Sequence, residues 1–94
     1  MLAGMTLEGR IAIVTGAASG MGAATSQLLA EAGATVLGVD IAEHPAVAFT
    51  GDVSDPGFCD ATVAETVSRH GRLDILVNAA GVIVRADAPA TDDD

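Results

Sequence analysis

Short apolar runs alternate with longer amphipathic stretches along most of the chain. The runs at 10–15, 34–39, 47–50 and 73–77 predict strands, because each is brief and ends at a glycine or a polar residue. Apolar residues at helical spacing predict helices over 20–32 and 56–70. Strands that alternate with helices are typical of a parallel α/β sheet, with right-handed crossovers that place the two helices on opposite faces.

Both predicted helices have recognisable limits. Gly33 and Gly71 stand just past the two helix ends, where glycine is the usual residue. Asp55 is suited to the N-cap of the second helix, and Pro56 to its first position. These residues set the helix boundaries without reference to any other part of the chain.

The connection between the second and third strands is too short for a regular helix. It covers residues 41–46, and Pro45 lies within it. Parallel neighbouring strands normally need about a dozen connecting residues, usually with a helix. We therefore expect one covering helix to be absent and one face of the sheet to be partly uncovered there.

The most informative stretch joins the first strand to the first helix. Gly16 supplies backbone angles that a Cβ atom forbids, while Gly20 and Gly22 allow close approach of a ligand and of the neighbouring strand. The first N–H groups of a helix carry about half a positive charge, so an anion such as a diphosphate is favoured there. The spacing Gly-x-x-x-Gly-x-Gly differs from the commoner Gly-x-Gly-x-x-Gly, and a plain strand-to-helix turn is the alternative interpretation.

With Thr15 in front, this stretch resembles the cofactor fingerprint of the short-chain dehydrogenase/reductase family. Further motifs follow the family's order, namely Leu7-Glu8-Gly9-Arg10, Asp40, Asp52-Val53 and Asn78-Ala79-Ala80-Gly81. The resemblance covers essentially the whole chain. It implies a Rossmann-like, doubly wound parallel sheet of which residues 1–94 form the first half, in strand order 3-2-1-4. We expect a single, incomplete NAD(P)-binding domain that stops at a helix start near Thr91.

Asp40 ends the second predicted strand. An acid there can accept hydrogen bonds from the adenosine ribose hydroxyls and would repel a phosphate on that ribose. Family members that prefer NADP usually carry a basic residue in the glycine loop or just after this strand, where Ser19 and Ile41 stand here. The resemblance therefore implies NAD in preference to NADP. A solvated aspartate at a strand end is the alternative.

The resemblance also implies roles for the later motifs. Asp52 and the N–H of Val53 would face the adenine edge, Asn78 would steady the central sheet, and Gly81 would lie against the cofactor ribose. A helix-capping aspartate and a strand-ending turn remain the structural alternatives. The complete predicted cofactor site is Gly16, Ser19, Gly20, Met21, Gly22, Asp40, Ile41, Asp52, Val53, Asn78, Ala79, Ala80 and Gly81.

Residues for the family's chemistry are absent from these 94 residues. The family transfers hydride with a Tyr-x-x-x-Lys pair, a serine and an asparagine, but the chain has no tyrosine and no lysine. No catalytic residue is therefore predicted. We expect the N-terminal, cofactor-binding part of an NAD-dependent oxidoreductase that interconverts a small alcohol and a carbonyl. A non-catalytic NAD-binding module and a truncated product without function remain open alternatives.

Composition narrows the partners and the compartment. The net charge of −9 argues against nucleic acid or an anionic membrane surface as a partner. Cys59 is the only cysteine, which excludes an internal disulfide and favours the reducing cytoplasm. The uncharged stretch 11–30 is too rich in glycine and polar side chains for a membrane span. His44 and His70 lack partners at metal-ligand spacing, so no metal is expected, and the resemblance implies a homo-oligomeric whole protein.

Overall fold

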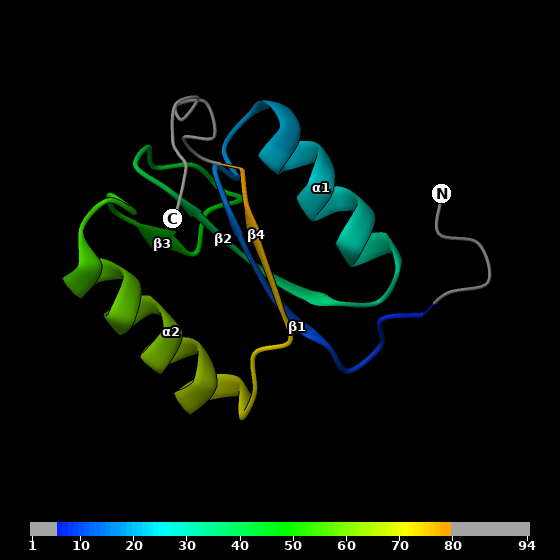
Figure 1. The fold of residues 1–94 in the computed structure, drawn as a ribbon. Helices are drawn as coiled ribbons and strands as arrows, with labels where there is room; N and C mark the ends of the chain where they lie inside the picture. Colours follow the sequence, from blue (N-terminus) through cyan, green and yellow to red (C-terminus); the bar gives the residue numbers. More distant parts are fainter. Residues whose placement is uncertain (1–5, 80–94) are drawn as a thin grey trace, which may run out of the picture.

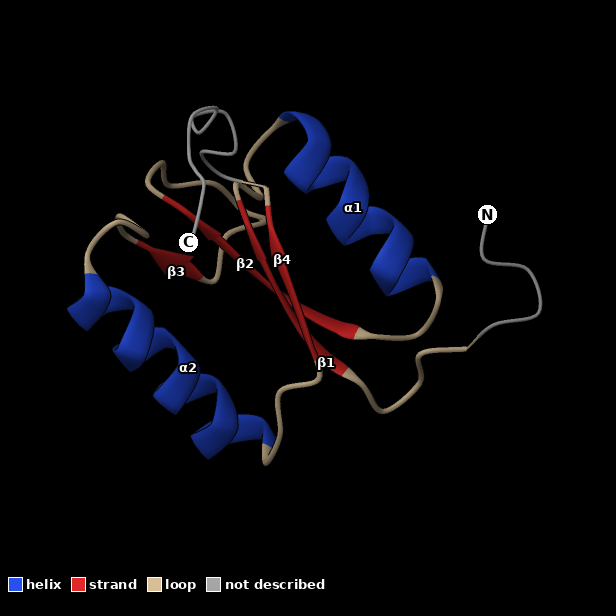
Figure 2. Ribbon diagram, in the orientation of Figure 1, coloured by secondary structure: helices blue, strands red, loops and turns tan. Residues whose placement is uncertain are grey.

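A parallel sheet lies between two helices, one on each face (Figure 1). The computed structural model describes residues 6–79. The alternation of strand and helix predicted from the sequence is the one observed (Figure 2). The elements are β1 (Ile11–Thr15), α1 (Gly20–Glu31), β2 (Thr35–Asp40), β3 (Phe49–Thr50), α2 (Pro56–His70) and β4 (Ile75–Asn78).

The strand order is β3-β2-β1-β4, and every pair is parallel, as the resemblance implied. In this register Thr15 lies opposite Val39 of β2 and Asn78 of β4. The carboxyl ends of the strands therefore meet at one edge of the sheet. That edge is where open α/β sheets bind their ligands.

Strand β1 is the centre of the core. All five of its residues are buried, because it has a neighbouring strand on each side and a helix over each face. This environment explains why the strand is a continuous apolar run with no alternation. The buried core cluster is Ile11, Ile13, Leu37 and Val39, with Phe49, Val53, Phe58 and Leu73 packed against it.

The predicted helix limits are confirmed, except that α1 ends at Glu31 and Ala32 is its C-cap. The Asp55 carboxylate accepts a hydrogen bond from the Gly57 N–H at 2.9 Å and so caps α2. Gly71 ends α2 with a φ of +81°, and Gly33 follows α1 with a φ of +107°. Residues 41–48 contain no helix, as the short connection and Pro45 led us to expect.

Strand β3 is shorter than the predicted 47–50. The N–H of Val47 donates to the His44 carbonyl at 2.9 Å, which closes a turn. Bonding to β2 begins only with the Ala48 N–H, which donates to the Gly38 carbonyl at 2.7 Å. The turn therefore takes up the residues that the apolar pattern assigned to a strand.

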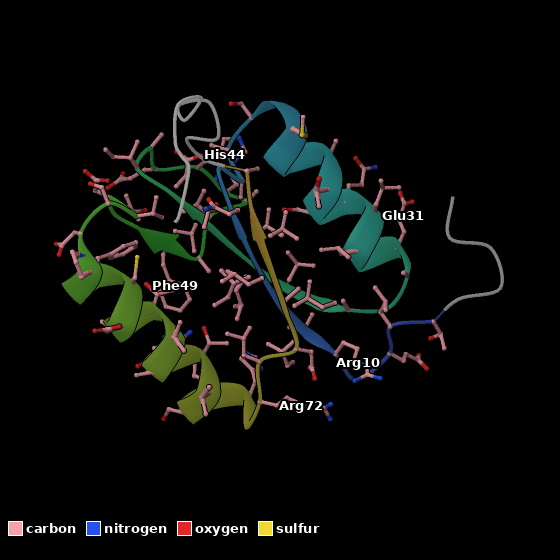
Figure 3. The ribbon with its side chains drawn as sticks, in the orientation of Figure 1. Arg10, Glu31, His44, Phe49 and Arg72 are labelled. Atoms are coloured by element: carbon pink, nitrogen blue, oxygen red, sulfur yellow. The ribbon has the colours of Figure 1, made fainter. Side chains whose placement is uncertain are left out.

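Strand β4 begins two residues later than the predicted 73–77, because Asp74 bonds to β1 through its side chain. The Asp74 carboxylate accepts the Ile11 N–H at 2.8 Å, and the Asp74 N–H donates to the Ile11 carbonyl at 2.9 Å. The same carboxylate pairs with Arg72 at 2.8 Å and with Arg10 at 3.6 Å, and both arginines lie where β1 and β4 begin (Figure 3). Asp74 thus links β1 and β4 at the amino ends of the two strands.

Candidate functional site

A cleft of about 500 Å³ opens at the carboxyl edge of the sheet. Segments that follow all four strands contribute to it, although they are far apart in the sequence. Its lining residues are Gly16, Ser19, Met21, Gly22, Val39, Asp40, Ile41, Gly51, Asp52, Val53, Ser54 and Ala79.

Glycines shape the turn between β1 and α1. Gly16 and Gly20 have φ values of +71° and +61°, a region that residues with a Cβ rarely adopt. Gly22 is buried, and a Cβ there would clash with the carbonyl group of Gly16. A Cβ at Gly20 would meet no atom within 4 Å, so this position needs glycine for its backbone angle and not for packing.

The start of α1 has no side-chain cap. Ser19 occupies the N-cap position with extended angles, but its side chain makes no capping hydrogen bond, and the first turn has no acidic residue. Helix α2 is different, because Asp55 caps it. The first N–H groups of any helix lack acceptors within the helix. At the start of α1, Ser19, Met21 and Gly22 line the cleft, whereas Gly20 does not, and N–H groups at such a helix start favour an anion.

Asp40 lies beside this turn, at the end of β2. One carboxylate oxygen, Oδ1, accepts the Ala42 N–H at 3.0 Å, and the other, Oδ2, accepts the Ala18 N–H at 3.0 Å. These two hydrogen bonds hold the pKa of Asp40 below its ordinary value, so the carboxylate is ionised at neutral pH. The sequence predicted the strand-end acid, but it did not predict the bond to the glycine turn.

Asp52 contributes a second carboxylate to the cleft, from the loop after β3. Its Oδ1 accepts both the N–H of Ser54 at 2.9 Å and the Ser54 hydroxyl at 2.8 Å. These bonds lower the pKa of Asp52. Val53 lies next to it, and the exposed side chains of Ile41 and Met21 give the cleft an apolar contribution.

The side chain of Asn78 joins two strands of the sheet. Its Oδ1 accepts the Thr15 hydroxyl at 2.9 Å, which joins the ends of β4 and β1. That the asparagine steadies the central sheet stays a prediction. Ala79 lines the cleft, whereas Ala80 and Gly81, like the helix start at Thr91, lie outside the described residues.

Sequence reasoning missed three residues that line the cleft, namely Val39, Gly51 and Ser54. Val39 and Gly51 directly precede the two predicted aspartates. Ser54 stands two positions after Asp52, a spacing at which an aspartate commonly bonds to the backbone and closes a turn. That spacing was a usable signal for Ser54.

A second cavity, of about 180 Å³, lies between α2 and the sheet. Its lining is mainly apolar and contains no charged side chain among the described residues. Cys59 lies there, and its Sγ donates to the Val53 carbonyl at 3.1 Å. This cavity offers packing space without the converging polar groups of the cleft.

Fold and cleft together define a Rossmann-like α/β protein in which a glycine-containing strand-to-helix turn opens onto the cleft. No described helix is both long enough and apolar enough to cross a membrane.

A sequence model of the family described as short chain dehydrogenase matches residues 10–94, and the chain therefore belongs to this family. It is 37% identical to the 2-dehydro-3-deoxy-D-gluconate 5-dehydrogenase of Dickeya dadantii, over 87% of this chain and 37% of that protein. It is 40% identical to the 3-oxoacyl-[acyl-carrier-protein] reductase FabG of Thermotoga maritima, over 83% of this chain and 37% of that protein. The chain thus spans little more than a third of the length of these relatives.

A solved structure of a dehydrogenase is similar to this chain in fold. The ligand-free aldohexose dehydrogenase of Thermoplasma acidophilum superposes with a TM-score of 0.74 at 29% sequence identity, over 81% of this chain and 31% of that one. The family uses NAD(P) as its cofactor. The uncapped start of α1 and its glycine turn fit the diphosphate of such a dinucleotide.

Proposed function

We propose that this chain is the cofactor-binding part of an NAD-dependent short-chain dehydrogenase/reductase. The observation that carries the proposal is the uncapped start of α1, which opens onto the same cleft as the carboxylates of Asp40 and Asp52. Binding is the role of these 94 residues, because the sequence contains neither the tyrosine nor the lysine of the family's proton-transfer pair. A bound NAD would supply the hydride-transfer chemistry.

The diphosphate would be held by the turn and by the first turn of α1. The backbone N–H groups there point toward the cleft end of the helix and carry partial positive charge. Because these donors belong to the backbone, their aim depends on the glycine angles and not on side-chain identity. The residues assigned to the diphosphate are Gly16, Ser19, Gly20, Met21 and Gly22.

The adenosine half of the cofactor would lie between the two carboxylates. Asp40 would accept the ribose hydroxyls, with Ile41 beside it, while Asp52 and the N–H of Val53 would face the adenine edge. Residues 78–81 would approach the middle of the cofactor, where small side chains permit close contact.

The preference for NAD over NADP follows from charge. The Asp40 carboxylate is ionised, and the neighbouring Ser19 and Ile41 supply no positive charge to offset it. Two like charges about 4 Å apart near a protein surface repel by roughly 4 kcal/mol, and solvent reduces this further. The 2′-phosphate of NADP would therefore be disfavoured.

The proposal for the whole protein is an oxidoreductase that interconverts a small alcohol and a carbonyl. The alcohol and sugar dehydrogenases and the reductases among the relatives support this reaction class. The whole protein is proposed to be a cytoplasmic homo-oligomer that binds neither nucleic acid nor a membrane, in keeping with the acidic composition and the single cysteine.

Calorimetric titration with NAD and NADP tests the proposal. We expect the protein to bind NAD at least about tenfold more tightly than NADP, since even 1.4 kcal/mol of the repulsion gives that factor. Asp40→Ala should bring the ratio of the two affinities toward one. Asp52→Ala is the matched control, because it removes an acid of the same cleft away from the ribose and should leave the ratio unchanged. Equal affinity of the unaltered protein for both cofactors would contradict the assignment.

A further inference from the structure

The glycine turn is tied to β2 by two consecutive backbone amides. The N–H of Ala17 donates to the carbonyl of Val39 at 3.1 Å. The next N–H, that of Ala18, donates to the carboxylate of Asp40 at 3.0 Å. One acceptor is backbone and is present whatever residue stands there, whereas the other is supplied by a single side chain.

Close packing supports the first of these bonds but not the second. Ala17 is fully buried, and Gly38 of β2 lies so near that a Cβ on it would come within 2.8 Å of the Ala17 Cβ. Ala18 is only partly buried. The Asp40 carboxylate is itself held from the other side, because its second oxygen accepts the Ala42 N–H at 3.0 Å. Asp40 is therefore a fixed bridge between the end of β2 and the turn.

We propose that Asp40 is a positioning residue for the diphosphate-binding turn, in addition to being the ribose acceptor. This inference rests on the proposed function. Its carboxylate holds Ala18 so that the N–H groups of the following residues, from Ser19 to Gly22, already point into the cleft before a cofactor arrives. Preorganised donors bind an anion more tightly, because their ordering cost has been met during folding.

The proposal predicts an effect opposite in sign to that of charge alone. Removal of a negative charge at the mouth of an anion site should strengthen anion binding. Loss of the bond to Ala18 should weaken it, since the turn becomes free to move. A ligand without a ribose separates this effect from any contact between Asp40 and the adenosine ribose.

Inorganic pyrophosphate is such a ligand, and its binding can be followed by NMR shift titration. We expect Asp40→Ala to weaken pyrophosphate binding about three- to tenfold, the worth of one hydrogen bond. Asp40→Asn keeps one oxygen that can accept the Ala18 N–H but sets its NH2 group against the Ala42 N–H, so it should recover only part of the lost pyrophosphate affinity. Glu43→Ala removes an exposed acid just after β2 that does not line the cleft, and it should not weaken pyrophosphate binding.

Amide hydrogen exchange in the free protein tests the bridge without any ligand. The Ala18 amide should be protected in the unaltered protein and exchange at least about tenfold faster in Asp40→Ala, while that of Ala17 changes little. Pyrophosphate affinity and Ala18 exchange that are both unaffected by Asp40→Ala would overturn the inference. If this variant fails to fold, an unprotected Ala18 amide in the unaltered protein overturns it. A protected Ala18 in a protein that binds neither pyrophosphate nor NAD would instead contradict the proposed function.

Discussion

Gly22 shows how a single residue joins the fold to the site. It lies in the first turn of α1, and the carbonyl of Gly16 occupies the space that a Cβ would need. The helix can therefore begin close against the turn only while this position has no side chain. The aim of the backbone N–H groups into the cleft depends on that contact.

Gly22→Ala should both destabilise the protein and weaken cofactor binding. The added methyl group meets backbone that cannot rotate away, and overpacking of this kind costs about 1–3 kcal/mol. Because the helix start must shift to relieve it, we expect at least about tenfold weaker NAD binding. Urea unfolding and calorimetry measure the two effects.

Gly57→Ala is the matched control. Gly57 also lies in the first turn of a helix, but the nearest atom to an added Cβ is an Asp55 carboxylate oxygen at 3.4 Å. Alanine is a better helix former than glycine, so stability should stay equal or rise by up to about 1 kcal/mol. Similar losses in both variants would show that the effect at Gly22 is not one of close packing.

Asp74 makes the stability of the sheet dependent on pH. Hydrogen bonds from Arg72 and from the Ile11 N–H lower its pKa in the folded protein, below the value of about 3.9 for an unfolded chain. Its stabilising contribution is therefore present above pH 3.9 and is lost as the pH falls through the lower, folded-state pKa. Asp74→Asn should be less stable at pH 7 and lose less of its remaining stability between pH 5 and pH 2. Urea unfolding at several pH values measures the free energy of unfolding of both proteins. If that free energy fell with pH equally in the variant and in the unaltered protein, the prediction would be wrong.

At the scale of elements, α2 connects the sheet to one side of the cleft. Its buried residues are the small Thr62 and Thr66, so the helix has few large groups to anchor it. Phe58, in the first turn of α2, is one such large group, because the phenylalanine ring packs closely against Gly51. Gly51 begins the loop that carries Asp52. The position of α2 therefore influences where that acid lies.

Phe58→Ala should lower the free energy of unfolding by about 2 kcal/mol. A fully buried phenylalanine costs about 3–5 kcal/mol on truncation, and Phe58 is only partly buried. Val67→Ala, at an exposed position on the same helix, should change it by no more than about 0.5 kcal/mol. Urea unfolding compares the two, and equal losses would mean that α2 is not anchored through Phe58.

At the scale of the whole molecule, β4 is the end strand of the sheet that the structure describes. It pairs with β1, and its Leu76 side chain is 61% exposed beside the apolar cavity under α2. An apolar edge strand of this kind is a template for pairing with another chain.

We predict that a polypeptide of residues 1–94 alone is marginally stable and self-associates. Leu76→Lys should reduce the association, because a charged side chain near an edge strand makes pairing costly. Sedimentation velocity over a range of protein concentrations measures the self-association of both polypeptides. A sharp, reversible melt of a monomer, with no dependence on concentration, would count against the prediction.

Much of the fold could be predicted because its signals are local. Asp55 and Gly71 mark the limits of α2 through backbone groups within a few residues of each. The strand order came from resemblance, and the observed sheet confirms it. Nine of the thirteen predicted site residues line the cleft, because parallel strands end at one edge, whereas Gly20 and Asn78 do not line it and Ala80 and Gly81 lie outside the described residues.

By itself, then, the sequence determined the alternation of strands and helices, the helix limits, and the glycine turn with its nearby acids. Local backbone preferences and the apolar pattern suffice for these features. Only the tertiary structure decided that β3 shortens to two residues, that Asp74 replaces a strand acceptor, and that Asp40 holds Ala18. In each case a donor or acceptor has several partners that it could bond. Which partner it bonds depends on which groups the packed sheet brings within about 3 Å of it.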